Sequence, residues 1–124
     1  MTADVLTEET TTSAAYTDLA TTGPTVTKSM VNGQTALVIV SCIAYGATDG
    51  DAFMSFAVSG ALTLAASDAN GAKNRTNAND KSTITRVTVI TATSTATATV
   101  TAKYKATSAA STTFGHRRII IKTF

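Results

Sequence analysis

The residues of this sequence that could carry out chemistry are few and lie far apart. There is one histidine, His116, one cysteine, Cys42, and eight acidic residues. His116 precedes Arg117 and Arg118, and two guanidinium groups could grip a phosphate or a carboxylate because each presents a two-pronged set of donors. On a strand, however, adjacent side chains point to opposite faces, so these arginines do not form one clamp. The run therefore predicts no catalytic site, while a role in a protein contact stays open.

Other short motifs also favour structural interpretations. Residues 49–51 (Asp-Gly-Asp) resemble part of a calcium loop but lack the third acid and the closing Glu, so a plain turn is expected. Residues 74–76 match a glycosylation sequon, yet no signal-peptide pattern accompanies them, and we interpret the match as chance. Cys42 lies in the most apolar segment and is expected to be an inert core thiol. A lone histidine does not predict a metal site. We predict no enzyme activity, no cofactor and no metal.

Threonine and alanine dominate the composition. The chain has 124 residues and a mass of 12.7 kDa, with 27 Thr and 22 Ala but one Pro and no Trp. Threonine suits a pleated surface, whereas long charged helix formers are scarce. The length fits one domain. The single cysteine excludes an internal disulfide, and the longest apolar stretch, residues 36–47, is too short to span a bilayer, so we expect folding in a cytoplasm without membrane contact.

Alternation of apolar and polar residues predicts strands along most of the chain. The clearest case is residues 95–105, where small apolar residues alternate with Thr and Lys over the whole stretch. The other expected strands span residues 25–31, 34–45, 52–59, 61–66, 83–91 and 113–124. This pattern predicts an all-β fold, an antiparallel, jelly-roll-like β-sandwich of about seven to eight strands. The sandwich is assigned to residues 25–124, and residues 1–24 are expected to form an extended arm outside it.

The segment 34–45 is apolar on both faces of the expected strand. The face expected to fill the sandwich carries Leu37, Ile39 and Ile43. The opposite face carries Val38, Val40 and Cys42, which would leave an exposed apolar stripe unless a second copy of the chain covered it.

Two further expectations concern the second half of the chain. The apolar residues of segment 83–91 change phase, which predicts a bulge near Arg86, and residues 67–81 are expected to form a long polar loop.

Charge is distributed unevenly along the chain. Residues 1–51 carry six acids and one base, a balance of −5, and residues 52–124 carry nine bases and two acids, a balance of +7. Halves of opposite sign can cancel within one fold or can attract the complementary halves of neighbouring copies, and we favour the first alternative. The basic C-terminal third has no aromatic residues interleaved as a stacking platform, so nucleic-acid binding is not predicted.

Several segments of structural residues resemble a known family. They are residues 16–19, 23–26, 53–61, 67–69, 102–104 and 114–121. In these segments the sequence resembles the small Thr/Ala-rich β-sandwich structural proteins and modules of tailed bacteriophages, which occur as capsid decoration (cement) proteins and as parts of minor tail or fibre proteins. The resemblance covers most of the chain from about Tyr16. It implies a homo-oligomer, often a trimer, that binds the major capsid protein or other virion proteins.

The sequence and the resemblance together predict a non-enzymatic virion component, assembled in the host cytoplasm. A capsid decoration protein is the first hypothesis, and a tail or fibre component that contacts the host surface through residues 67–81 is the second. A small hydrolase is a distant third. The residues expected to make protein contacts are Glu8, Glu9, Lys73, Arg75, Arg117, Arg118, Val38 and Val40.

Overall fold

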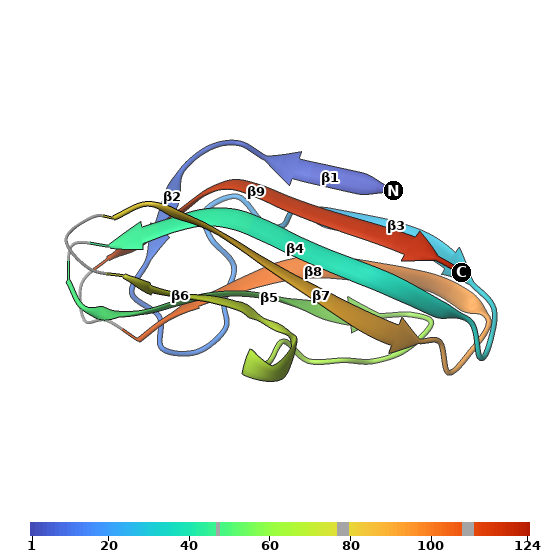
Figure 1. The fold of residues 1–124 in the computed structure, drawn as a ribbon. Coiled ribbons are helices and arrows are strands. Elements are labelled where there is room, and N and C mark those ends of the chain that lie inside the picture. Colours follow the sequence, from blue (N-terminus) through green and yellow to red (C-terminus); the bar gives the residue numbers. More distant parts are fainter. Residues whose placement is uncertain (47, 77–79, 108–110) are drawn as a thin grey trace.

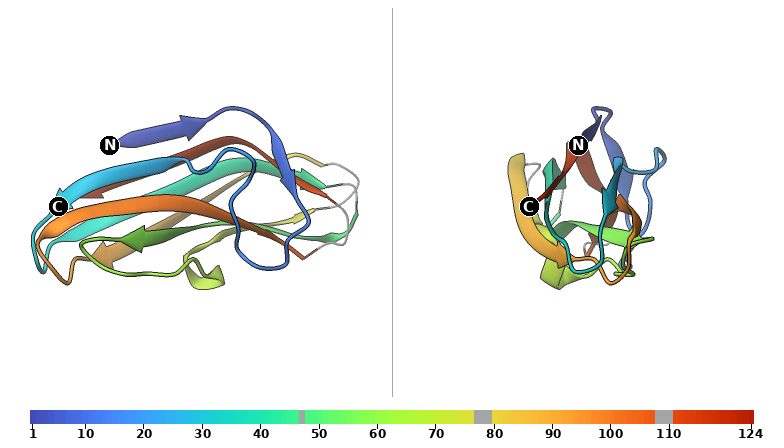
Figure 2. Two further views of the ribbon diagram at one scale, coloured as in Figure 1. Left: turned by 180° about the vertical axis from the view of Figure 1, so that it is seen from behind. Right: turned by 90° about the vertical axis from the view of Figure 1, so that its right-hand side faces the viewer.

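Two antiparallel sheets pack face to face in the computed structural model, which describes residues 1–46, 48–76, 80–107 and 111–124 (Figure 1). Within these residues there are nine strands, so the predicted β-sandwich is confirmed with slightly more strands than expected. The right-hand view of Figure 2 looks along the strands and shows the two layers. No helix in the described part of the chain has the length and apolarity that a membrane span requires.

Each sheet is built from strands that are distant in the sequence. Sheet A contains β1 (Thr2–Val5), β2 (Glu9–Thr11), β4 (Thr35–Gly46), β7 (Ser82–Thr91) and β9 (Thr112–Thr123). Its order is β1-β9-β4-β7, and β2 also pairs with β9. Sheet B contains β3 (Thr25–Met30), β5 (Gly50–Ser59), β6 (Ala72–Thr76) and β8 (Ala96–Ala106), in the order β3-β8-β5-β6. A short 3-10 helix, η1 (Asp68–Asn70), precedes β6.

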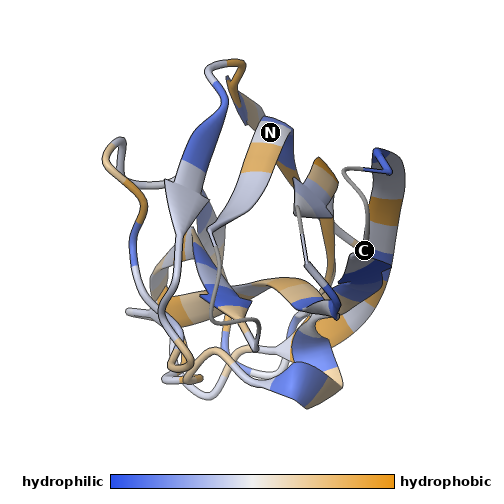
Figure 3. Ribbon diagram, turned by 90° about the vertical axis from the view of Figure 1, so that its left-hand side faces the viewer, coloured by the Kyte–Doolittle hydropathy of each residue, from blue (hydrophilic) through white to orange (hydrophobic). Residues whose placement is uncertain are grey.

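The core lies between the sheets. Hydrophobic and hydrophilic residues alternate along several of the strands, as the coloured bands in Figure 3 show. In β8 the inward residues Ala98, Val100, Ala102 and Tyr104 are buried, as the sequence predicts. Asn32 and Gly33 form the turn after β3, with Gly33 at a φ of 84° and the Gln34 N–H donating to the Val31 carbonyl. It carries the chain from sheet B to sheet A instead of closing a hairpin.

The expectation that residues 1–24 lie outside the sandwich is wrong. β1 and β2 both pair with β9, so they form one edge of sheet A. Further along, Thr17 pairs with Tyr104 of β8, and Leu19 is buried in the core. The segment therefore crosses from one sheet to the other and closes the side of the sandwich.

Two expectations for the middle of the chain are also corrected. Segment 67–81 is not one continuous loop, because it contains η1 and the strand β6, which pairs with β5. Residues 77–79 of that segment lie outside the described residues. Segment 61–66 forms only an isolated bridge between Leu64 and Val58.

The prediction of a bulge near Arg86 is wrong, and the structure has a bulge in β9 instead. The pairing of β7 with β4 is regular over its whole length. In β9 the pairing with β4 shifts, so that His116 and Arg117 together lie opposite Cys42. His116 has a left-handed φ of 46°. Because the extra residue reverses the phase of the strand, Phe114, Arg117 and Ile119 all face the core.

This conformation predicts the effect of changing His116. A side chain with a Cβ is strained at positive φ, and the imidazole is exposed, so little contact is lost on its removal. His116→Gly is therefore expected to raise the free energy of unfolding by about 0.5–1 kcal/mol, whereas His116→Val should lower it by about 1–2 kcal/mol. Urea denaturation of both variants measures this. Equal destabilisation by Gly and Val would show that the left-handed backbone is not the deciding factor.

Candidate functional site

The residues with potential chemistry are separate in the structure. No group of three or more His, Cys, Asp or Glu side chains comes together among the described residues. Cys42 is buried, and desolvation raises the pKa of its thiol to about 12, so it stays protonated at neutral pH. Asp51 forms an ion pair with Lys73 at 3.2 Å, and the Asn74 side-chain amide donates to the Ala44 carbonyl at 3.3 Å.

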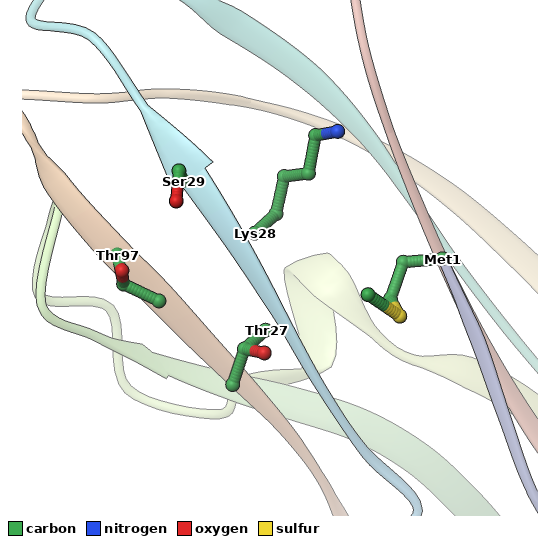
Figure 4. A pocket seen from close by; sticks show the side chains of 5 residues that line it. All are labelled: Met1, Thr27, Lys28, Ser29 and Thr97. Atoms are coloured by element: carbon green, nitrogen blue, oxygen red, sulfur yellow. The ribbon is translucent and has the colours of Figure 1, made fainter.

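One shallow pocket of about 370 Å³ lies at the side of the sandwich where β1 and β3 approach each other (Figure 4). It is lined by Met1, Thr27, Lys28, Ser29 and Thr97. Apart from Lys28 and Met1 the lining consists of small hydroxyl side chains. Such a lining offers one cation and no nucleophile paired with a base, so it has the composition of an ordinary surface recess.

Arg117 is the most prominent buried polar residue. Its side chain is fully buried, and its guanidinium forms a salt bridge with the Glu9 carboxylate. The Nη1 atom also donates to the carbonyls of Thr21 and Gly23, each at 3.3 Å, and the guanidinium lies 5.2 Å from the centre of the Tyr104 ring. Arg117 faces inward and Arg118 is exposed, so the two arginines form no single clamp, as predicted. The carboxylate partner of Arg117 is Glu9.

Glu9, in the N-terminal segment (residues 1–24), is the salt-bridge partner of Arg117. The Thr21 N–H and hydroxyl donate to its carboxylate at 2.9 Å and 2.8 Å. Burial acts to raise the pKa of Glu9, but the hydrogen bonds from Thr21 and the charge of Arg117 outweigh it and hold the pKa below its usual value. Glu9 and Arg117 therefore fasten the segment before β3 onto the core.

Glu8 fastens the same segment from the outer side of sheet A. Its carboxylate accepts a hydrogen bond from the Tyr45 hydroxyl at 2.7 Å and lies 3.6 Å from the Lys81 ammonium. The side chain crosses β9 at Gly115, where a Cβ would come within 2.7 Å of the Glu8 Cγ. The hydrogen bond from Tyr45 and the nearby Lys81 lower the pKa of Glu8. Glu8 thus links the N-terminal segment to β4.

The two oppositely charged halves of the chain neutralise each other within the fold. Five of the six acids in residues 1–51 form ion pairs with bases from residues 73–118. These pairs are Asp4–Arg118, Glu8–Lys81, Glu9–Arg117, Asp18–Lys103 and Asp51–Lys73. The favoured alternative, cancellation within one chain, is confirmed. Arg118 is exposed, as expected, but its guanidinium binds Asp4 of its own chain at 2.6 Å.

These ion pairs predict that the N-terminal segment loosens in acid. The pKa values of Asp4, Glu8, Glu9 and Asp68 are all lowered by their partners. A lowered carboxyl pKa contributes stability above the unfolded value of about 4 and loses it as the pH falls through the folded value. The thermal midpoint should therefore be lower at about pH 3 than at about pH 6, with the loss beginning near about pH 4. Glu9→Gln should show a smaller change, and a midpoint that is constant over this range would contradict the role of the carboxylates.

The expected contact role of Val38 and Val40 is wrong, because both side chains are fully buried in the core. The strand does have an apolar outer face, but it carries the opposite set of residues. Leu37 pairs with Val89, and Ile39 lies between Val87 and Ile120. We call these five residues the aliphatic patch. It lies on the outer face of sheet A, and Val87 and Val89 are 51% and 60% exposed.

The remaining candidates lie elsewhere. Lys73 and Arg75 are exposed on β6 at the edge of sheet B, and Lys73 also lies 5.6 Å from the centre of the Phe53 ring. Glu8 and Arg118 are on the outer side of sheet A and are paired within the chain. The structure therefore brings Glu8, Glu9, Arg117 and Arg118 together around the N-terminal segment, and leaves Lys73 and Arg75 apart from them.

Sequence reasoning missed the aliphatic patch, although a signal for it existed. In segment 83–91 Val87 and Val89 lie on one face and Ile84 and Ile90 on the other, so both faces carry aliphatic residues, as in segment 34–45. In a two-layer sandwich only one face of each strand is covered by the other sheet, so one of the two aliphatic sets must lie outside. The sequence does not show which set is outermost.

Comparisons with known proteins give little guidance. No known protein family matches the sequence. No curated protein is similar to it either. Among solved structures, the chain is similar to dimeric latent PorU from Porphyromonas gingivalis, with 12% sequence identity and a TM-score of 0.44. The match covers 98% of this chain but only 13% of the PorU chain, so the chain spans a small part of that protein.

Proposed function

We propose that this chain is a non-enzymatic structural component of a tailed-bacteriophage virion, and that it acts as a capsid decoration protein. The observation that carries the proposal is the aliphatic patch on the outer face of sheet A. Aliphatic residues that lie side by side on an exposed sheet favour a protein partner, because their burial releases structured water from both surfaces. The resemblance of the sequence to phage decoration proteins suggests that this partner is the major capsid protein.

The electrostatics of the chain support an apolar mode of attachment. The acids of the first half are mostly used in ion pairs within the chain, so they are already neutralised when the chain meets a partner. Exposed ion pairs contribute about 0–1 kcal/mol each, whereas a fully buried Val or Ile contributes about 1.5–3 kcal/mol. In this proposal the patch provides the affinity, and repetition of the contact over a symmetric shell strengthens it.

A tail or fibre component is the second candidate. It is favoured by the two exposed bases on β6, Lys73 and Arg75, which lie within the segment expected to contact the host surface. In that case sheet B, and not sheet A, would meet the partner. The two candidates thus use different sides of the sandwich.

Immunogold electron microscopy of purified phage particles tests the proposal. An antibody against this chain should label the capsid shell evenly. Label confined to the tail would support the second candidate, and particles that carry no label while the infected cell contains the protein would contradict both. Blocking the antibody with the purified chain provides the specificity control.

A further inference from the structure

The edges of the two sheets differ sharply in length. Within the described residues, three of the four edges are formed by strands of three to six residues: β1 and β2 on sheet A, and β3 and β6 on sheet B. Each of these strands carries at least one charged residue. The fourth edge, β7, has ten residues and pairs only with β4.

β7 has one charged residue, Arg86, and lacks the other features that normally protect an exposed edge. It contains no Pro and no Lys, and its register with β4 is unbroken from Ser82 to Thr91. Its single charged side chain, Arg86, is turned back to donate to the Ala69 carbonyl at 2.9 Å. Natural proteins protect free edges with short strands, charges, prolines or bulges, because an unprotected edge pairs with another strand. β7 is therefore suited to pairing with another strand.

The backbone groups on this edge can be assigned. The Ala92 N–H donates to the Gln34 carbonyl at 2.9 Å, next to the first pair of the β4–β7 ladder. Since N–H groups alternate along a strand, those of Ile90 and Thr88 point toward β4 and those of Val89 and Val87 point away from it. The outward N–H and C=O groups of the odd-numbered residues form the free edge.

We propose that β7 pairs antiparallel with β7 of a second copy about a two-fold axis, so that the two A sheets become one continuous sheet. Length selects this partner, because no other edge strand in the described part of the chain matches ten residues. A two-fold register with Val87 opposite Val87 also places each Arg86 opposite Thr88 of the other copy, which keeps the like charges apart. This pairing specifies how the oligomer of the proposed function forms.

The pairing has a consequence for the aliphatic patch. Val87 and Val89 lie on β7, so the patches of the two copies would meet at the new strand pair and form one surface. Two linked patches bind a repeating partner more strongly than one, because the second contact forms within the same complex. The unit that attaches is then a dimer, whereas the resemblance to phage proteins implies a trimer.

Solution mass and amide exchange test the pairing directly. Light scattering of the full chain should give twice the 12.7 kDa of one chain. Hydrogen exchange followed by NMR should show that the amides of Val87 and Val89 are protected at concentrations where the dimer forms, and that they exchange freely on dilution. A mass of one chain or of three chains, or free exchange of these amides in the dimer, overturns the proposal.

A proline substitution gives a matched mutational test. Val89→Pro removes an N–H that points to the free edge and leaves the β4 ladder intact, and proline is tolerated on sheet edges. It should raise the dimer dissociation constant about thirtyfold, since a two-fold pair loses two hydrogen bonds. Val89→Ala keeps the N–H and should retain the dimer. If Val89→Pro is folded and still fully dimeric, the pairing is wrong. If Val89→Pro unfolds, the protection of the Val87 and Val89 amides in the unaltered chain decides whether the pairing exists.

The pairing and the proposed function can fail separately. A chain that is monomeric in solution but labels the capsid would overturn the edge pairing and keep the decoration role. A chain that forms the protected dimer but is missing from particles would keep the pairing and overturn the role. Ile39→Lys changes the outer face of β4 and should leave the dimer intact. It therefore distinguishes dimer formation through the β7 edge from attachment through the aliphatic patch.

Discussion

Arg117→Ala is expected to destabilise the protein by about 3–5 kcal/mol, because it leaves the Glu9 carboxylate without its cationic partner in a largely enclosed site. The variant also loses the donors to the Thr21 and Gly23 carbonyls, which hold the segment before β3. Unfolding in urea, followed by circular dichroism, measures the change. Amide exchange should show that residues 9–23 open first.

The neighbouring residue provides the control for this experiment. Arg118 forms an ion pair with Asp4, but its side chain is 54% exposed, so Arg118→Ala should cost no more than about 1 kcal/mol. Glu9→Gln combined with Arg117→Met should recover part of the loss, because no charge is then left unpaired. Similar losses for the two alanine variants would show that Arg117 is not the anchor described above.

Val40→Lys is expected to prevent folding, whereas Ile39→Lys should give a folded protein that no longer attaches to its partner. The two residues are adjacent on β4 and point to opposite faces. Val40 is fully buried, so a lysine there would place an unpaired charge in the core and cost more than about 4 kcal/mol. Ile39 lies in the aliphatic patch, where a lysine can reach solvent.

Circular dichroism and binding to purified particles measure these two outcomes. Ile39→Lys should keep the β-sheet spectrum and lose binding, and Ile39→Leu should keep both. An unfolded Ile39→Lys variant would mean that the outer face of β4 is part of the core. A folded variant with full binding would show that the patch is not the contact surface.

The sequence predicts the strands of this fold far better than the side of each strand that faces inward. β8 is predicted correctly because its two faces differ in polarity along its whole length. β4 is apolar on both faces, and the prediction that Leu37, Ile39 and Ile43 fill the core is wrong. The inward set is the smaller one, including Val38 and Val40, because large side chains from other strands already fill the interior. These are Met54, Phe56, Tyr104, Phe114 and Arg117.

The N-terminal strands could not be predicted from periodicity. β1 and β2 are held mainly by backbone pairing with β9, and backbone hydrogen bonds leave no pattern in the side chains. The ion pairs of Asp4, Glu8 and Glu9 were equally hidden, since they join residues more than 70 positions apart. In the sequence, only the opposite net charges of the two halves of the chain indicate that such ion pairs form.

The sequence carries a signal for the bulge between Phe114 and Ile119, and not around Arg86. Phe114 and Ile119 are both buried although they are separated by an odd number of positions, which requires an extra residue between them. The similar change of phase around Arg86 has another cause. Val87 and Val89 are exposed, so they are not part of an inward set.

The number of copies of this chain in a purified phage particle tests the proposed function most directly. It is measured by quantitative mass spectrometry of phage particles purified from cultures that produce this chain, with the major capsid protein as the internal standard. A decoration protein should be present in a fixed ratio to the major capsid protein and should be depleted in particles assembled with the Ile39→Lys variant. A few copies per particle, or none in particles that are otherwise complete, would contradict the decoration role.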